Sequence, residues 1–235
     1  MDRGIFAKSS DVDGLNAATV RRNVFFNNGN SAFALEVQGS GSAPALNAKF
    51  YENIVYNSRG GVSSGLVETS GQSKNIDIYN NTFYNLDYGI SLTGLIGIQI
   101  YNNIFSNIQG MNIASKKAGP YSNRFDYLDN NLYFNEGREW ALELYATNNE
   151  ILRSLAAWKQ AHINSRLSVL DSNPDINSIS ADPQFTNVAN NNFTVKASSP
   201  ASPSYQNGRY NNGIGAIVIG ISGLRPKPIT NLSIE

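Results

Sequence analysis

Cysteine is absent from the 235 residues, and no stretch of the chain approaches the run of about 18 apolar residues that a membrane-spanning helix needs. The first absence excludes disulfides and thiolate metal sites, and the second excludes a helical membrane span. An excess of one charge is lacking too, since 18 Lys and Arg residues face 18 Asp and Glu residues. Without net charge, no whole-protein field attracts nucleic acid or an anionic membrane, and we expect neither as a partner.

Several functional motifs are also missing. The only histidine, His162, excludes mechanisms that need two imidazoles, and we interpret it as a residue near the C-terminal end of a helix. Gly60-Gly61 and Gly213-Ile214-Gly215 lack the lysine and the following helix of a phosphate-binding loop, so we interpret both as turns. Residues 1–4 contain no basic segment followed by an apolar one, so no signal peptide is visible.

Asparagine, by contrast, is abundant, at 33 of 235 residues. Much of it belongs to a six-residue pattern with Asn at its second and sixth positions. Five copies occur, at residues 22–27, 52–57, 80–85, 102–107 and 130–135. Their second-position Asn residues are separated by 30, 28, 22 and 28 residues, which indicates a fixed structural unit with connections of variable length.

Between the copies, apolar residues alternate with period two and predict short strands. The clearest pairs are Ile76 and Ile78, Ile90 and Leu92, and Ile98 and Ile100. Three short strands in each repeat predict one full turn of a parallel solenoid, because a hairpin array would need connections of about two residues. Asn tolerates left-handed backbone angles and can hydrogen-bond an Asn one coil away. We therefore predict one column of stacked Asn side chains: Asn23, Asn53, Asn81, Asn103 and Asn131.

On these repeats the sequence resembles the right-handed parallel β-helix proteins of the pectate-lyase-like class. The resemblance implies three-stranded coils with the Asn column between the second and third strands, so that residues 76–79 form a second strand, 82–84 a third and 89–93 the next first strand. The C-terminal third is similar to a recurrent ending of that class, in residues 154–158, 181–185, 191–193, 199–201 and 214–216. The expected fold is an all-β, right-handed, single-stranded parallel β-helix of about five to six coils with one short α-helix.

We expect residues 1–222 to form the β-helix domain and residues 223–235, which contain a stiff Pro-rich run, to be a linker or the stub of a following domain. Coils should extend to about residue 146, followed by a helix at about 154–162 and an irregular cap at 164–222. Gly- and Ser-rich connections are expected at 38–47 and 58–64. Nothing before Gly4 could cover the first coil, which predicts self-association through that edge or a longer protein that ends with this chain.

The resemblance places substrate in a groove along the first strand of each coil. With Val37 and Val67 pointing inward, Glu36 and Glu68 would point outward on adjacent coils. Two carboxylates about 5 Å apart would suit an acid/base pair or a Ca²⁺ site, with Lys8 and Arg59 at its edge. The structural alternative, solvated glutamates on an exposed face, stays open.

A second outward row comes from the second strands. Tyr51, Tyr79 and Tyr101 occupy equivalent positions and could stack sugar rings, with Lys49 and Asp77 making polar contacts beside them. Stacking of like residues between coils explains the same row without a ligand.

The resemblance also implies a function: a polysaccharide as partner, and a secreted or cell-surface protein that is the C-terminal part of a polysaccharide lyase or glycoside hydrolase. A lyase needs a base and a cationic neutraliser for a uronate carboxylate, for which Lys8, Arg59 and Lys116 are the candidates. A hydrolase would need Glu36 and Glu68 themselves. The alternative is a non-enzymatic glycan-binding or adhesion module in which the coils form a rigid support.

Overall fold

A computed structural model of the chain describes residues 4–9, 18–38, 45–67, 73–116, 123–134, 139–144, 150–163, 168–169, 175–203, 208 and 213–216. The strands are β1 (Ile5–Ser9), β2 (Thr19–Arg21), β3 (Val24–Phe26), β4 (Ser31–Gln38), β5 (Ala45–Tyr51), β6 (Ile54–Val67), β7 (Ser73–Tyr79), β8 (Thr82–Thr93), β9 (Leu95–Tyr101), β10 (Ile104–Ser106), β11 (Met111–Lys116), β12 (Arg124–Asp129), β13 (Leu132–Phe134), β14 (Glu139–Leu144), β15 (Glu150–Leu152), β16 (Ser168–Val169), β17 (Ile179–Ser180), β18 (Phe185–Asn187) and β19 (Asn192–Val195). The helices are α1 (Leu155–Ile163) and the short 3-10 helix η1 (Val188–Asn190).

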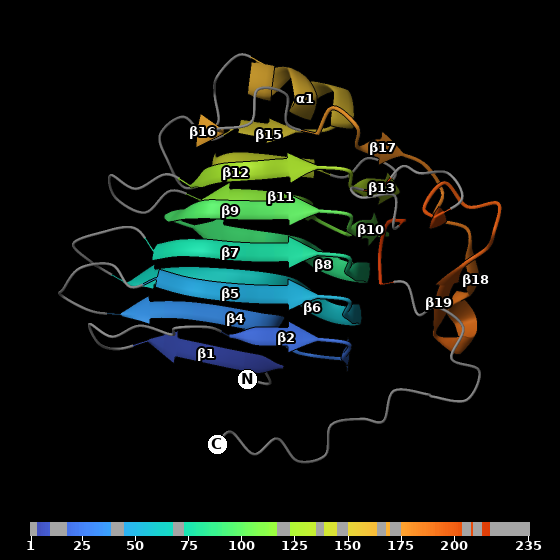
Figure 1. Ribbon diagram of the computed structural model, residues 1–235, viewed down its shortest axis with the longest axis horizontal. Helices are drawn as coiled ribbons and strands as arrows, with labels where there is room; N and C mark the ends of the chain where they lie inside the picture. The colour runs from blue at the N-terminus through green and yellow to red at the C-terminus, as the bar shows by residue number, and fades with distance from the viewer. Residues whose placement is uncertain are drawn as a thin grey trace.

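The chain passes back and forth between two large sheets, and Figure 1 shows their strands piled up from β1 and β2 at one end to α1 at the other. One sheet has the order β16-β12-β9-β7-β5-β2. The other has the order β1-β4-β6-β8-β10-β13-β17, with β11 joining β8 to β14 and β3 beside β6. Pairing in both is parallel apart from β14 with β15. The prediction of a mainly β chain with parallel sheets and one short α-helix is confirmed.

The predicted loop at residues 58–64 is wrong, because these residues lie inside β6 (Ile54–Val67). Their glycines are packing residues rather than turn residues. A Cβ on Gly60 would lie 2.2 Å from the ring of Tyr88, and one on Gly61 would lie 2.5 Å from the ring of Phe83. Glycine is therefore required where the next repeat's aromatic rings press against the strand. Of the other expected connection, at 38–47, residues 39–44 lie outside the described residues.

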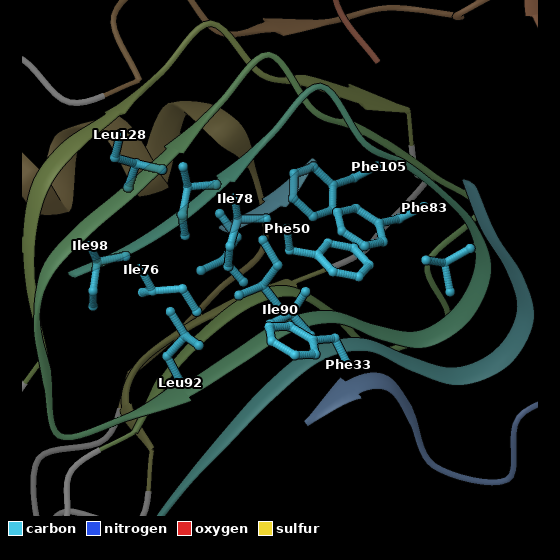
Figure 2. Packing of buried hydrophobic residues seen from close by; sticks show 14 of the residues in the cluster. Phe33, Phe50, Ile76, Ile78, Phe83, Ile90, Leu92, Ile98, Phe105 and Leu128 are labelled. Carbon is cyan, nitrogen blue, oxygen red and sulfur yellow. The ribbon is translucent and has the colours of Figure 1, made fainter. Parts of the chain in front are cut away.

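The core between the sheets contains a column of aromatic rings. Phe33, Phe50, Phe83, Phe105 and Tyr133 are buried, and the ring centroids of Phe83 lie 6.4 Å from Phe50 and 5.2 Å from Phe105. Figure 2 shows these phenylalanines gathered on one side of the core with aliphatic side chains on the other: Ile76, Ile78, Leu92, Ile98 and Leu128. Burial of each large side chain contributes about 1.5 to 3 kcal/mol, so the aromatic column stabilises the stack of repeats.

The predicted Asn column is present. The backbone N–H groups of Asn23, Asn53, Asn81 and Asn103 each donate to the side-chain oxygen of the next Asn at 3.0 Å. The side-chain amides bind one another and the backbone carbonyls of the preceding repeat, as Asn81 Nδ2 does at Phe50 O (2.8 Å). We call these residues, with Asn131, the inner Asn column; it ends where the N–H of Asn131 donates to Ser178 Oγ at 2.8 Å.

The left-handed residue of each bend is not the inner Asn, which corrects the sequence-based explanation. It is the residue before it, with φ between 52° and 59° at Arg22, Glu52, Asn80, Asn102 and Asn130. A second set of left-handed residues follows the third strands, with φ between 49° and 54° at Asn27, Asn57, Asn85 and Asn107. We call this second set the outer Asn column.

Helix α1 covers one end of the core (Figure 1). Ser154 Oγ accepts the N–H of Ala157 at 3.1 Å, the N-cap that the sequence predicts, and Trp158 and Ala161 are buried. His162 lies within the last turn of α1, as expected. Trp158 Nε1 donates to the buried carboxylate of Asp175 at 2.6 Å, which ties the helix to the segment that ends the inner Asn column.

The segment after the helix folds back over the outer side of the third strands. Phe185 and Phe193 pack against Tyr56 and Tyr84, and Ile214 packs in the cluster around Ile104 and Leu132. Two backbone N–H groups fix it there, Gly215 to Asn102 O at 2.7 Å and Ala216 to Thr82 Oγ1 at 3.1 Å. The face of the third strands is thus covered, which leaves the outer sides of the first and second strands for binding. The domain boundary expected near residue 222 lies outside the described residues.

Candidate functional site

The outer side of β1, β4, β6, β8 and β11, here called the first-strand face, contains one row of predicted site positions. In the register of the sheet, Lys8 of β1 pairs with Glu36 of β4, and Glu36 pairs with Gly65 of β6. Thr93 of β8 pairs with Lys116 of β11 at the corresponding end of those strands. The backbone therefore brings the positions of Lys8 and Glu36 together, while their side chains lie outside the described part of the structure.

The register does not place Glu68 beside Glu36. Val67 pairs with Gln38, and Leu66 pairs with Val37, so Val67 has the opposite parity to the one that the sequence suggested. The part of β6 after Gly61 contains few apolar residues that could indicate its register from sequence. In the structure, Val62 of β6 lies opposite Phe33 of β4. Glu68 itself lies outside the described residues.

Arg59 lies at the corner where the third strand of one repeat turns into the first strand of the next. Its neighbour on the adjacent repeat is Asp87, because Ser58 pairs with Leu86 and Gly60 with Tyr88. Both Arg59 and Asp87 are exposed. Neither side chain makes an ion pair with a residue in the described part of the chain.

Arg59 and Asp87 both line a shallow, open concavity of about 470 Å³. We call it the corner concavity, and its lining is Gly29, Asn57, Ser58, Arg59, Asn85, Asp87 and Gln109. The outer Asn column forms part of this lining. Asn85 Nδ2 donates to Asn57 Oδ1 at 2.7 Å, Asn107 Nδ2 donates to Asn85 Oδ1 at 3.1 Å, and Gln109 Nε2 donates to Asn107 Oδ1 at 3.1 Å. The concavity therefore offers amide donors and acceptors beside one cation and one anion.

Lys116 ends the row on the first-strand face and is half-buried. Burial lowers the pKa of its ammonium group, and the positive charge of Arg59 lowers that pKa further. A lysine whose pKa is lowered in this way is a better proton acceptor than a solvated one.

The tyrosine row lies on the outer side of the other sheet, as predicted, but its rings stack on one another. The Tyr79 ring lies 4.6 Å from that of Tyr51 and 5.0 Å from that of Tyr101, with interplanar angles of 6° and 3°. Arg21 lies over the remaining side of Tyr51, and Tyr127 packs edge-on against Tyr101. The faces of the Tyr79 ring are occupied, so a sugar can approach only the ring edges and hydroxyl groups. Burial, and then the neighbouring tyrosines, raise the pKa of Tyr79, which keeps that hydroxyl neutral.

Lys49 and Asp77 form the expected polar row beside the tyrosines. Lys49 pairs with Asp77 in register, and Asp77 pairs with Gln99. Lys49 is exposed, whereas Asp77 is half-buried. This surface lies on a different sheet from Arg59 and Lys116, so the two sets of predicted residues do not form one site.

Sequence reasoning missed Asp87 and the amides of the corner concavity. The available signal was the sixth position of each repeat, where Asn recurs as regularly as at the second position. Two residues beyond it, Arg59 and Asp87 follow Asn57 and Asn85 in successive repeats.

Neither a family model, nor a curated protein, nor a solved structure matches this chain. Within the described ranges, no group of three or more His, Asp or Glu side chains is placed to hold a metal ion. The Ca²⁺ site considered at Glu36 and Glu68 depends on side chains outside those ranges. No helix in the described part of the chain is long and apolar enough to cross a membrane.

Proposed function

We propose that this chain is a right-handed parallel β-helix that binds polysaccharide on its first-strand face, at the corner concavity. Support for the fold comes from the regular alternation between two parallel sheets, from repeats that each add one strand to both, and from the inner Asn column. We also propose, from the same repeats, that the chain is similar to pectate-lyase-like proteins. A secreted or cell-surface location is part of this proposal.

One observation carries the binding proposal. The corner concavity combines two exposed charges, neither of them ion-paired with a described residue, with amide groups that recur from one repeat to the next. Sugars bind through many hydroxyl groups, which need both donors and acceptors at short spacing. Because the amides recur along the stack, an extended chain of sugar units fits this lining better than a single small molecule.

If the protein is also an enzyme, we propose lyase chemistry in preference to hydrolysis. The observation that favours it is the pKa of Lys116, which burial lowers first and the positive charge of Arg59 lowers further. In such a reaction Arg59 would neutralise a uronate carboxylate and Lys116 would accept the α proton. Hydrolysis would instead need a pair of carboxylic acids. A non-enzymatic binding module is the second proposal, and it is supported by the self-stacked tyrosines, which act as structural residues.

Binding can be tested by screening the purified protein on a glycan array and measuring the strongest ligands by calorimetry. We expect Arg59→Gln to weaken binding by about three- to tenfold, as for loss of one charge-assisted hydrogen bond. The matched control is Lys49→Gln, which removes a cation from the other sheet. Weaker binding for Lys49→Gln with no change for Arg59→Gln would move the site to the tyrosine row, and a blank array would refute the binding proposal.

Lyase activity can be tested on the same ligands by ultraviolet absorbance of unsaturated products. Lys116→Gln should abolish the signal while leaving binding within about twofold, because the proposed role of Lys116 is proton transfer. Binding without any unsaturated or reducing-end product, even at high enzyme concentration, would favour the non-enzymatic module.

A further inference from the structure

Arg59 and Asp87 occupy corresponding positions on adjacent repeats without forming an ion pair. Arg22 and Glu52 also occupy equivalent positions on adjacent repeats, and there the guanidinium and carboxylate meet at 2.6 Å. Arg59 and Asp87 have the same one-repeat relationship, yet no ion pair joins them. Both residues line the corner concavity.

This arrangement is poorly suited to a ligand with charge of one sign only. An anion bound at Arg59 would be repelled by Asp87, and a cation bound at Asp87 would be repelled by Arg59. A like charge about 6 Å away costs roughly threefold in affinity even with the screening of bulk water, and more where water is displaced. A unit with both charges avoids this loss and gains from each partner.

We infer that the corner concavity selects an amphoteric glycan, in which a sugar carboxylate binds Arg59 and the free amine of a neighbouring sugar binds Asp87. The inference rests on the proposed function and adds its substrate class. Asn57, Asn85 and Gln109 line the same concavity and supply the polar contacts for the sugar hydroxyl groups. N-acetylation would remove the positive charge of the amine, and the ligand would lose its electrostatic attraction to Asp87.

The test uses one oligosaccharide in three forms, so that length and linkage stay constant. Hyaluronan oligosaccharides carry carboxylates and N-acetyl groups; chemical N-deacetylation exposes the amines, and carboxyl reduction of the deacetylated form leaves amines alone. Affinity is measured by calorimetry at pH 6, where the sugar amine is protonated. We expect the deacetylated form to bind about five- to tenfold more tightly than either of the other two.

Variants of Arg59 and Asp87 test whether these two residues cause the preference for the deacetylated form. Asp87→Asn should bind the acetylated and deacetylated forms equally, and Arg59→Gln should no longer distinguish the carboxylate from its reduced form. The exchange Arg59→Asp with Asp87→Arg should recover the preference for the deacetylated form, because both charges are again present. Asp77→Asn on the other sheet is the matched control and should leave the preference unchanged. Arg59 and Asp87 are exposed, so the melting temperatures of their variants should stay within a few degrees of the wild type.

The outcomes separate the inference from the proposed function. Equal binding of the three forms, or a preference that survives Asp87→Asn, would overturn the inference while leaving glycan binding intact. Tightest binding of the acetylated or the carboxyl-reduced form would also overturn it. Absence of binding to these forms and to a broad glycan array would refute the proposed function together with the inference.

Discussion

Removal of one member of the inner Asn column is the sharpest test of how the repeats are held together. In Asn81→Ala, the buried N–H of Asn53 loses its acceptor, which lies at 3.0 Å, and the carbonyl of Phe50 loses its donor at 2.8 Å. The link from Asn81 Nδ2 to Asn103 Oδ1, at 3.0 Å, is lost as well. A buried polar group left without a partner costs about 1 to 3 kcal/mol, so two such groups predict a loss of about 2 to 6 kcal/mol.

The assay is urea unfolding followed by circular dichroism, with the free energy taken by linear extrapolation. Asn190→Ala is the matched control, because Asn190 is exposed and only its backbone N–H makes a hydrogen bond, to Asn187 Oδ1. It should change the free energy of unfolding by less than about 0.5 kcal/mol. If Asn81→Ala costs no more than Asn190→Ala, with an unchanged slope m, the column does not stabilise the stack and the reasoning fails.

Three further perturbations test other parts of the structure by the same unfolding assay. Gly61→Ala should destabilise by about 1 to 3 kcal/mol, because its Cβ would clash with the Phe83 ring, whereas Gly65→Ala has open space and should be nearly neutral; equal effects would contradict the packing role. Tyr79→Phe keeps the ring stack and should cost less than about 0.5 kcal/mol, while Tyr79→Ala should cost about 1 to 3 kcal/mol, and a harmless alanine would show that the stack is not structural. Burial raises the pKa of Asp175 to about 6, so the folded state binds its proton more tightly than the unfolded state; this contribution is complete below about pH 4 and is lost as the pH rises through 6. The free energy of the wild type relative to Asp175→Asn should therefore fall by about 1 to 3 kcal/mol between pH 4 and 7, and a difference that rises with pH would reverse the sign of the argument.

Much of the fold could be predicted from the sequence because the same residue types recur at the same positions of each repeat. The inner Asn column and the strands after it could be read from five copies of one pattern, each with alternating apolar residues. The prediction of a loop at 58–64 was wrong because Gly and Ser usually indicate turns. Here the role of the glycines depends on the rings of Phe83 and Tyr88 in the next repeat. Such contacts reach across about one repeat of sequence, and local propensity carries no information about them.

The site was less predictable, because it depends on register. The strand around Val62 contains few apolar residues, so the sequence did not show which of its residues point outward. In the structure, the register pairs Glu36 with Gly65 and not with the neighbour that the sequence suggested. Arg59 was found from its charge alone, but its relation to Asp87 required the pairing of β6 with β8. The tyrosine row was found correctly, while the stacking of its rings on one another depends on side-chain conformations that a sequence does not specify.

Each bend contains a left-handed residue followed by a residue of the inner Asn column, and these two positions differ in how strictly they require Asn. The left-handed position holds Arg22 and Glu52 in two copies and Asn in three, whereas the following position is Asn every time. A left-handed backbone costs an ordinary L-residue roughly 1 to 2 kcal/mol, and an exposed pair such as Arg22 with Glu52 adds little against it. That strain is tolerated because Asn23 and Asn53 fix the bend through hydrogen bonds to buried backbone groups. A short side chain with both a donor and an acceptor makes those bonds, which favours Asn at the column position, whereas the strained position admits several residues.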